Sequence, residues 1–396
     1  MSEFKNLPSG WKVVRLGEIS SRVTRRNQDN RCQNVLTISA QSGLINQTDF
    51  FNKQVASKDL SNYILLKKGE FAYNKSYSTG YSFGAFKRLK FYEEGVASPL
   101  YIYFKFNDDV CSDFFEFYFD AGQANRQIKD IVQEGARNHG LLNLSIDDFF
   151  NIKIRMPNLD EQKKIAEILS TWDEAINLTI NLIESKKQFK KALMQNLLTA
   201  KIRFPQFKGE WKEIKLGNFL EEKSERNTKN IDLILSVTNK FGFVTQVEYF
   251  DKSVASDNTA NYKIVRKGNF AYNPSRINVG SIALLESYEI GILSPMYVVF
   301  ECLKNLDNRF LKFLFQSHSF MGNLFKYLAG SVRESLNFND MKTISIKLPN
   351  LKEQQKIVEV LTACDDEINL LNLKLENLKK QKQGLMQKLL SGKVRI

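Results

Sequence analysis

The feature that most constrains the fold of this chain is an internal repeat. Residues 11–17 return as residues 211–217, at an offset of 211 − 11 = 200. A Phe-Ala-Tyr-Asn motif begins at Phe71 and again at Phe270, at an offset of 199. A period near 195 residues is far longer than the roughly 20–50 residues of a solenoid repeat. The sequence therefore predicts that a whole domain and its connector have been duplicated.

The offset between the two copies falls along the repeat and then becomes constant. It is 196 at the Ser-Pro pairs that begin at Ser98 and Ser294, and 192 at Pro157 and Pro349. From these prolines to the end of each copy it stays at 192. The simplest organisation is a globular domain of variable length followed by an element of fixed length, twice over.

Composition indicates a folded, basic chain of two domains. The 396 residues, 43% of them hydrophobic and 26% charged, are too many for one ordinary core and exclude disorder and small disulfide scaffolds. The net charge of +13 suits a polyanionic partner such as nucleic acid. Because no segment resembles a signal peptide or a membrane span, we expect a cytoplasmic chain without a membrane partner. Four cysteines without CxxC spacing and two histidines predict no metal site.

The fixed-length elements are predicted to be two long helices. Residues 158–198 contain no Pro or Gly, residues 350–390 contain only Gly384, and a proline precedes each segment. Apolar residues recur in alternating steps of four and three, which is the a/d seam of a coiled coil. Such a seam needs a partner helix, and the other copy has the same length; the alternative is that each helix packs on its own domain. The predicted seam residues are Ile165, Leu169, Trp172, Ile176, Ile183, Leu193, Leu197, Ile357, Leu361, Cys364, Ile368, Leu371, Leu375, Leu378, Leu385 and Leu389.

An antiparallel helix pair would return the end of the chain to its beginning. Residues 393–396 correspond to residues 201–204, which lead directly into the second domain. We therefore expect the C-terminus to dock beside Phe4 and Trp11, giving a pseudo-twofold, circularly closed molecule. The predicted fold class is α+β: two repeated α/β domains, each with a curved antiparallel or mixed sheet, separated by a pair of long antiparallel coiled-coil helices.

The two copies diverge in two loop regions of each domain. One region follows the Phe-Ala-Tyr-Asn motif, and the other precedes the last strand before the long helix. Both are rich in side chains that hydrogen-bond to base edges, although plain surface loops need no such function. Candidate phosphate contacts are Lys75, Lys87, Arg88, Lys240 and Arg276. Candidate base contacts are Tyr77, Asn138, His139, Asn239, Ser275, Asn278, Arg333 and Glu334, with Arg137 in the same loop as His139.

No motif in the sequence predicts catalysis. The tetrapeptide at residues 273–276 is similar to the Asn-Pro-Pro-aromatic motif of adenine methyltransferases, but it lacks the second proline and the aromatic residue. It also aligns with residues 74–77 of the first copy, so a turn after a strand is the better interpretation. We find no glycine-rich loop for S-adenosylmethionine or ATP and no carboxylate cluster of a nuclease. We expect any chemistry to reside in partner subunits.

These features together resemble the specificity (S) subunit of type I restriction-modification systems. The resemblance covers the whole chain and is carried by Trp-x4-Leu-Gly at Trp11 and Trp211, by the Phe-Ala-Tyr-Asn segments, and by Pro-x-Leu-x-Glu-Gln-x2-Ile at Pro157 and Pro349. It implies that each domain reads one half of a bipartite asymmetric DNA site and that the paired helices set the spacing. The implied boundaries are residues 1–157 and 200–349 for the two target-recognition domains, 158–199 and 350–390 for the spacer helices, and 391–396 for the docking C-terminal segment.

The resemblance also implies partners and cofactors. Two methyltransferase (M) subunits would bind double-stranded DNA with this chain and methylate adenine N6, and two restriction (R) subunits would join where cleavage is active. S-adenosylmethionine, ATP and Mg²⁺ are expected in those partners and no cofactor in this chain, which is not an enzyme by itself.

Two alternatives belong to other classes of protein. One is a coiled-coil scaffold that never touches DNA, against which the net charge and the duplicated polar loops argue. The other is a self-contained methyltransferase or nuclease with recognition domains, against which the missing catalytic motifs argue.

Overall fold

The computed structural model describes residues 7–39, 41–51, 56–78, 80–132, 142–246, 258–329 and 335–396. The chain forms two compact units: residues 1–180 with 373–396 (unit 1), and residues 181–372 (unit 2). Each unit contains one globular domain and about half of each of two long helices, α6 (Leu159–Leu198) and α11 (Leu351–Leu390). Both helices have 40 residues and begin and end within one residue of the ranges expected from the sequence.

The domain of unit 1 is built on a four-stranded antiparallel sheet in the order β2-β9-β6-β7. Its strands are β2 (Ser20–Arg22), β9 (Ile102–Phe106), β6 (Phe71–Asn74) and β7 (Ala85–Arg88). Three antiparallel pairs surround it: β1 (Lys12–Arg15) with β10 (Lys153–Met156), β3 (Leu36–Ser39) with β4 (Gly43–Asn46), and β5 (Ile64–Lys67) with β8 (Glu94–Ala97). The helices are α1 (Leu16–Ile19), η1 (Gln28–Asn30), α2 (Gln47–Phe51), α3 (Ser112–Asp120), α4 (Asn125–Ile131) and α5 (Ile146–Phe150).

The domain of unit 2 repeats this topology strand for strand. Its sheet has the order β12-β19-β16-β17, formed by β12 (Leu220–Glu222), β19 (Val298–Cys302), β16 (Phe270–Tyr272) and β17 (Ile282–Leu284). The pairs are β11 (Lys212–Lys215) with β20 (Ser345–Leu348), β13 (Leu235–Thr238) with β14 (Gly242–Thr245), and β15 (Lys263–Arg266) with β18 (Ile290–Leu293). The helices are η2 (Leu216–Asn218), η3 (Pro274–Val279), α8 (Asn308–Gln316), α9 (His318–Ala329) and α10 (Phe338–Thr343). The predicted α+β class with two repeated domains is confirmed.

The Phe-Ala-Tyr motif lies on the central strand of each sheet, where both faces are buried. Phe71 and Tyr73 point into the aromatic cluster under α3, whereas Ala72 packs on the opposite side with Leu36 and Leu66. Side chains alternate between the faces of a strand, so the motif supplies large rings to one core and a small residue to the other. The Tyr73 hydroxyl donates to the Phe83 carbonyl at 2.7 Å, and burial raises the pKa of this phenol.

The Leu-Gly motif marks a close approach between segments. A Cβ atom on Gly17 would lie 3.3 Å from Phe150, and one on Gly217 would lie 2.7 Å from the Lys342 Cβ. The helices α1 and η2, which begin at Leu16 and Leu216, therefore pack directly against α5 and α10. Any larger residue would push these helices apart, which explains why glycine occurs in both copies.

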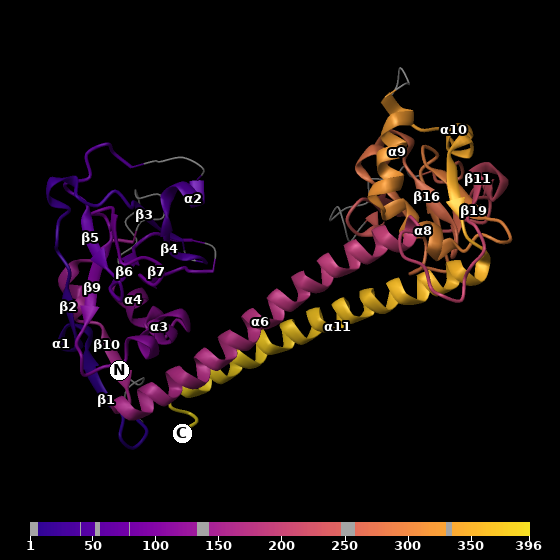
Figure 1. Ribbon diagram of the computed structural model, residues 1–396. Helices are drawn as coiled ribbons and strands as arrows, with labels where there is room; N and C mark the ends of the chain where they lie inside the picture. Colours follow the sequence, from indigo (N-terminus) through magenta and orange to yellow (C-terminus); the bar gives the residue numbers. More distant parts are fainter. Residues whose placement is uncertain are drawn as a thin grey trace. The chain divides into compact units, whose positions relative to one another are not determined.

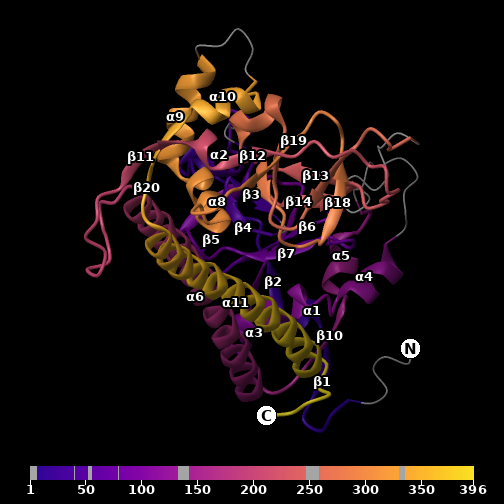
Figure 2. The same cartoon turned by 90° about the vertical axis from the view of Figure 1, so that its right-hand side faces the viewer.

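Within each unit, α6 and α11 lie side by side (Figures 1 and 2). In unit 2, Lys186 pairs with Glu367 and Lys190 with Asp365, so the residue numbers rise on one helix as they fall on the other. In unit 1, Asp173 pairs with Lys382, and Ile165 shares a core cluster with Leu389. Every predicted seam residue is buried or half-buried. The antiparallel coiled coil is therefore confirmed over the alternative of separately packed helices.

The C-terminal segment closes unit 1 as predicted. Gly392 packs against Pro8 and Trp11, and Arg395 donates to the Ser9 carbonyl. Phe4, the other expected neighbour, lies outside the described residues. Within the described ranges, no helix combines the length and apolarity that a bilayer crossing requires.

Candidate nucleic-acid interface and helix anchors

The Glu-Gln pair at the start of α6 joins this helix to the domain of unit 1. The Asn158 side chain caps the helix by accepting from the Glu161 amide at 2.9 Å. Gln162, which is fully buried, accepts from the Cys111 amide and donates to the Pro157 carbonyl, both at 2.9 Å. Glu161 is 5% exposed and accepts from Arg395 at 2.6 and 2.8 Å. The helix start is thus held by the domain on one side and by the end of the chain on the other.

Unit 2 contains the same anchor at the start of α11. Asn350 caps the helix, Gln354 accepts from the Asp307 amide at 2.8 Å, and the 1%-exposed Glu353 accepts from Arg203 at 2.9 and 2.8 Å. The hydrogen bonds that Arg203 and Arg395 donate to these carboxylates raise the pKa of both guanidinium groups. Arg203 lies in the connector after α6, and Arg395 takes the equivalent place in unit 1.

The two anchors differ at the tryptophan. The Trp11 indole donates to Glu161 at 3.3 Å, whereas the buried indole nitrogen of Trp211 has no hydrogen-bond partner among the described residues. From the sequence, the Glu-Gln motif carried only a family resemblance. The structure gives it a physical function, because it attaches each long helix to its domain.

Lysines at seam positions link the helices to each other and to the domains. Lys382 pairs with Asp173 at 2.5 Å and lies 5.0 Å from the centre of the Phe117 ring. Lys190 pairs with Asp365 at 2.5 Å and lies 5.2 Å from the centre of the Phe313 ring. In the sequence, the seam of the second helix skips one slot, which is the position of Lys382, whereas a search for apolar residues misses Lys190. The unbroken alternation of four and three steps would have found it, since Thr179, Lys186 and Lys190 fill the seam positions between Ile176 and Leu193.

The candidate DNA contacts of unit 1 fall into two groups. Lys75 and Tyr77 lie in the loop after β6, where Tyr77 is 62% exposed. Lys87 and Arg88 lie on β7 and form ion pairs with α3, at 2.8 Å to Asp120 and 2.5 Å to Asp113. Burial opposes the charged form of Lys87, but Asp120 outweighs it, so the pKa of this lysine is raised. The charges of Lys87 and Arg88 are therefore partly neutralised inside the domain before any phosphate approaches.

The structure brings three candidates of unit 2 together. Asn239, Lys240 and Asn278 line one hollow of about 620 Å³ between the β13–β14 turn and the end of η3. The exposed side chains of Phe241 and Val279 lie at the same hollow. The sequence named the three polar residues separately and missed the two apolar ones.

Ser275 and Arg276 are both exposed on η3 and do not line this hollow. Asn273 caps η3 by accepting from the Ser275 amide at 3.1 Å, and Pro274 occupies its first position. The tetrapeptide at residues 273–276 is thus a capped turn after a strand, as the sequence indicated. Five candidates lie outside the described residues, namely Arg137, Asn138, His139, Arg333 and Glu334.

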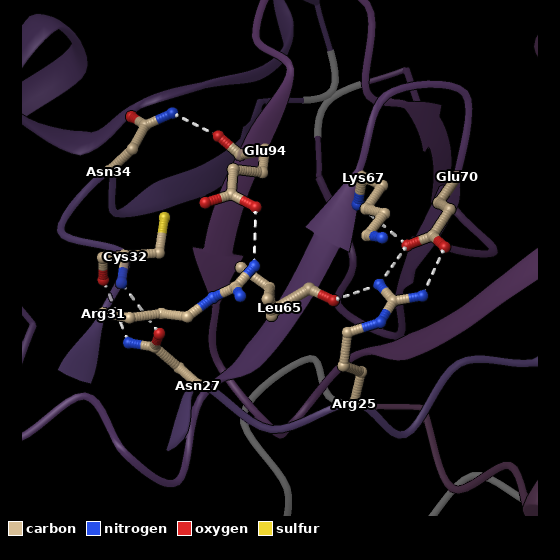
Figure 3. A network of polar contacts seen from close by, with 9 residues as sticks. All are labelled: Arg25, Asn27, Arg31, Cys32, Asn34, Leu65, Lys67, Glu70 and Glu94. Carbon is tan, nitrogen blue, oxygen red and sulfur yellow. Dashed lines mark hydrogen bonds and ion pairs between the residues drawn. The ribbon is translucent and has the colours of Figure 1, made fainter. Parts of the chain in front are cut away.

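A polar network under the sheet of unit 1 has a charge-reversed counterpart in unit 2. Arg25 donates to both oxygens of the buried Glu70 at 3.0 and 3.3 Å (Figure 3). In unit 2, Glu225 stands at the position of Arg25 and pairs with Arg266 at 2.9 Å. Arg266 stands at the position of Lys67, however, and Asn269 stands at that of Glu70. Each domain thus has an arginine–glutamate pair at this place, but the two pairs do not join the same two positions. We therefore assign these residues to the stability of each domain and not to DNA contact.

A loop anchor beside this network is unchanged between the units. The buried Asn27 donates to the Cys32 carbonyl and accepts from the Cys32 amide, at 2.9 and 3.0 Å (Figure 3). Asn227 makes the same two bonds to Ile231. Among the described residues, no group of His, Cys, Asp and Glu side chains could hold a metal ion.

The comparisons with known proteins agree with this architecture. A family model described as the type I restriction modification DNA specificity domain matches residues 8–186 and again residues 208–380. The MjaVIII specificity subunit of Methanocaldococcus jannaschii is 25% identical over 329 residues, covering 77% of this chain and 75% of that protein. The putative MjaX specificity subunit of the same organism is 26% identical over 268 residues, covering 62% and 60%.

Solved structures share the fold along nearly the whole chain. The HsdS subunit from Thermoanaerobacter tengcongensis has a TM-score of 0.56 at 17% identity, with both chains fully covered. The type I restriction-modification S subunit from M. genitalium has a TM-score of 0.53 at 14% identity, with 98% of each chain covered.

Proposed function

Because the chain belongs to the type I restriction-modification DNA specificity family, we propose that it selects the DNA sequence that a partner methyltransferase modifies. The observation that carries the proposal is the family match in both copies, on two units with one strand order. Each domain reads one half of a bipartite site. The shared strands and anchors supply the scaffold, and the loops that differ between the copies supply the sequence choice.

The proposed interface of each domain includes the loop that follows the Phe-Ala-Tyr-Asn motif. In unit 1 this is the segment with Lys75 and the exposed Tyr77. In unit 2 it is the segment with Asn278, together with Asn239 and Lys240 of the β13–β14 turn, which line the same hollow. Amide side chains read base edges in the major groove, and a lysine side chain is suited to phosphate. The loops after the Phe-Ala-Tyr-Asn motif carry different side chains in the two domains, which suits an asymmetric site.

The proposed partners are two copies of one methyltransferase subunit. Leu178 of α6 and Leu370 of α11 occupy equivalent positions at the offset of 192 and are 61% and 66% exposed. Leu182 corresponds to Lys374 and Phe189 to Gln381, so these exposed apolar residues are not repeated, and the repeated pair Leu159 and Leu351 is less exposed. Two identical partners need two identical contact points, and buried apolar side chains commonly anchor interfaces. Leu178 and Leu370 supply such a pair.

The proposed chemistry lies in the partners. The M subunits bind S-adenosylmethionine and methylate adenine N6, and R subunits with ATP and Mg²⁺ join where the system cleaves DNA. This chain contributes binding and positioning.

Methylation mapping tests the proposed function. The chain is expressed with its cognate M subunit in a host that lacks adenine-N6 methylation, and modified adenines are located by long-read sequencing. We expect one bipartite motif with an unread gap, and no methylation when this chain is omitted. Methylation without the chain, or at a continuous motif, would contradict the proposal.

A further inference from the structure

The Ser-Pro motif forms the same exposed turn in both domains. The Tyr101 amide donates to the Ser98 carbonyl at 3.3 Å, and the Tyr297 amide donates to the Ser294 carbonyl at 3.1 Å. Proline at the second position fixes the backbone of each turn. The third position holds Leu100 in one turn, 68% exposed, and Met296 in the other, 61% exposed. Two rigid turns thus present a large apolar side chain to solvent, where packing within the domain does not require one.

The sheet register places these turns beside the divergent loops. Tyr73 of β6 pairs with Ile102 of β9, so the residues after β6 run alongside the Ser-Pro turn of unit 1. In unit 2, the Asn273 side-chain nitrogen lies 3.7 Å from the Met296 sulfur. The loops that begin at these points hold the candidate phosphate contacts Lys75 and Arg276 and the candidate base contacts Tyr77 and Ser275. In both domains the apolar side chain and the reading loop therefore share one edge of the sheet.

Repetition distinguishes Leu100 and Met296 from neighbouring exposed rings. Tyr77, 62% exposed, corresponds to Arg276, and Phe91, 72% exposed, corresponds to Ser287. Residues that read different bases are expected to differ between the copies. A residue type that both copies keep suits something that both half-sites share, such as the base that is modified. An adenine inside a duplex must leave the stack before its N6 atom can be methylated.

We propose that Leu100 and Met296 are apolar wedges that enter the duplex beside each reading loop and unstack the step at the adenine to be methylated. Apolar side chains that insert between base steps partly unstack and kink the duplex. The preformed turn holds each side chain in place before DNA arrives. This inference rests on the proposed function and adds a positioning function for two residues that neither read bases nor carry catalysis.

The test uses the complex of the full chain with its cognate M subunit. DNA carries 2-aminopurine, whose fluorescence rises on unstacking, in place of the methylated adenine of one half-site at a time. We expect Leu100→Ser to reduce the rise at least about threefold in the half-site of domain 1 and to leave the other half-site unchanged. Met296→Ser should reduce the rise in the half-site of the unit 2 domain and leave the half-site of the unit 1 domain unchanged. Leu100→Met and Met296→Leu keep an apolar wedge and should keep the rise, and Phe91→Ser is the matched control for an exposed residue that is not repeated.

Two further readouts separate the outcomes. DNA binding is followed by anisotropy, and the number of M subunits by native mass spectrometry. An unchanged fluorescence rise in both serine variants would refute the proposal that Leu100 and Met296 unstack the duplex, while leaving the proposed function intact. Loss of the M subunit from a serine variant would also overturn it, because the turn would then be a protein contact. Failure of the wild-type complex to bind its bipartite site would instead refute the proposed function.

Discussion

Two glutamates are almost fully buried at the starts of the long helices, and each has one arginine partner. Glu353 is 1% exposed and binds Arg203, and Glu161 is 5% exposed and binds Arg395. A buried carboxylate without a partner is strongly destabilising, whereas replacing both members of a buried pair costs much less. The arginines are thus needed chiefly because the glutamates are there.

This asymmetry gives a prediction for Arg203 and Glu353. Arg203→Ala should lower the melting temperature of the chain, and the double variant Arg203→Ala with Glu353→Gln should recover part of the loss, because it removes the unpaired charge. Differential scanning calorimetry measures the melting temperatures of the wild type and of the two variants. A double variant less stable than Arg203→Ala would show that the carboxylate is stabilised by other contacts.

Cys302 at the end of β19 gives a prediction of chemical reactivity. Burial, with Asp307 and Glu301 nearby, raises the pKa of its thiol to about 12. Only the thiolate reacts with iodoacetamide, so we expect Cys302 at pH 8 to be alkylated at least about 100-fold more slowly than a free cysteine. Mass spectrometry of digested samples follows the rate, and the same cysteine in urea is the control. Equal rates in the folded and unfolded chain would contradict the assigned burial.

At the residue scale, sequence reasoning found side chains by type but not their partners. It identified Lys87 and Arg88 as cations, but not that Asp120 and Asp113 already bind them, because the contacts join β7 to a helix about 25 to 33 residues further along the chain. It also placed Asn239, Lys240 and Asn278 on two loops without showing that they share a hollow. Such proximity is set by the sheet register, which no local pattern reveals.

The long helices were the most predictable elements, because periodicity is a local property. The scarcity of proline and glycine predicted their ranges, and the alternation of four and three steps predicted their pairing. The skipped slot of the second helix showed the position of Lys382, but the polar seam positions of the first helix escaped, because a lysine interrupts an apolar pattern even when its charge is paired. These lysines are informative for pairing, since a polar residue at a seam position favours the one register in which it finds its partner.

A double-mutant cycle measures what Lys382 and Asp173 contribute. We expect a coupling free energy of about 1 kcal/mol between Lys382→Ala and Asp173→Ala, near the upper end for partly exposed pairs, because the lysine is 17% exposed and the aspartate 43%. The pair Lys356–Glu359 lies on one helix face and is the matched control, with an expected coupling of about 0.3 kcal/mol. Urea unfolding of each variant supplies the free energies. Equal couplings would mean that the cross-helix contact adds nothing specific.

The exposed leucines on the same helices give a prediction about partner number. Leu178→Lys and Leu370→Lys should each remove one of two M subunits, and the double variant should remove both, because a charge at the centre of an apolar contact is not solvated. Native mass spectrometry counts the subunits. Leu182→Lys, on the same helix and 44% exposed, is the control and should keep two. Two bound subunits in the double variant would place the docking surface elsewhere.

At the scale of the whole molecule, the duplication was visible in the sequence because the motifs that anchor and pack each unit recur. Gly17 and Gly217 allow close packing in the two copies, and Glu161 and Glu353 each hold an arginine at the start of a long helix. The sheet order was not predictable, because short strands such as Ser20–Arg22 pair with partners about 80 residues away. Closure of unit 1 by Arg395 was predictable, because Arg395 corresponds to Arg203, and the chain after Arg203 leads directly into the second domain.

The helices' proposed function as a spacer makes the last prediction. Deleting residues 179–185 and 371–377 removes one heptad from each helix, and leaves Asp173, Lys190, Asp365 and Lys382 in place. Each helix becomes about 10 Å shorter, which corresponds to at most about 3 base pairs of duplex. Because the reading loops are untouched, both half-sites should stay the same while the unread gap shortens. Methylation mapping decides between this outcome and its opposite: altered bases with an unchanged gap would mean that the helices do not set the distance.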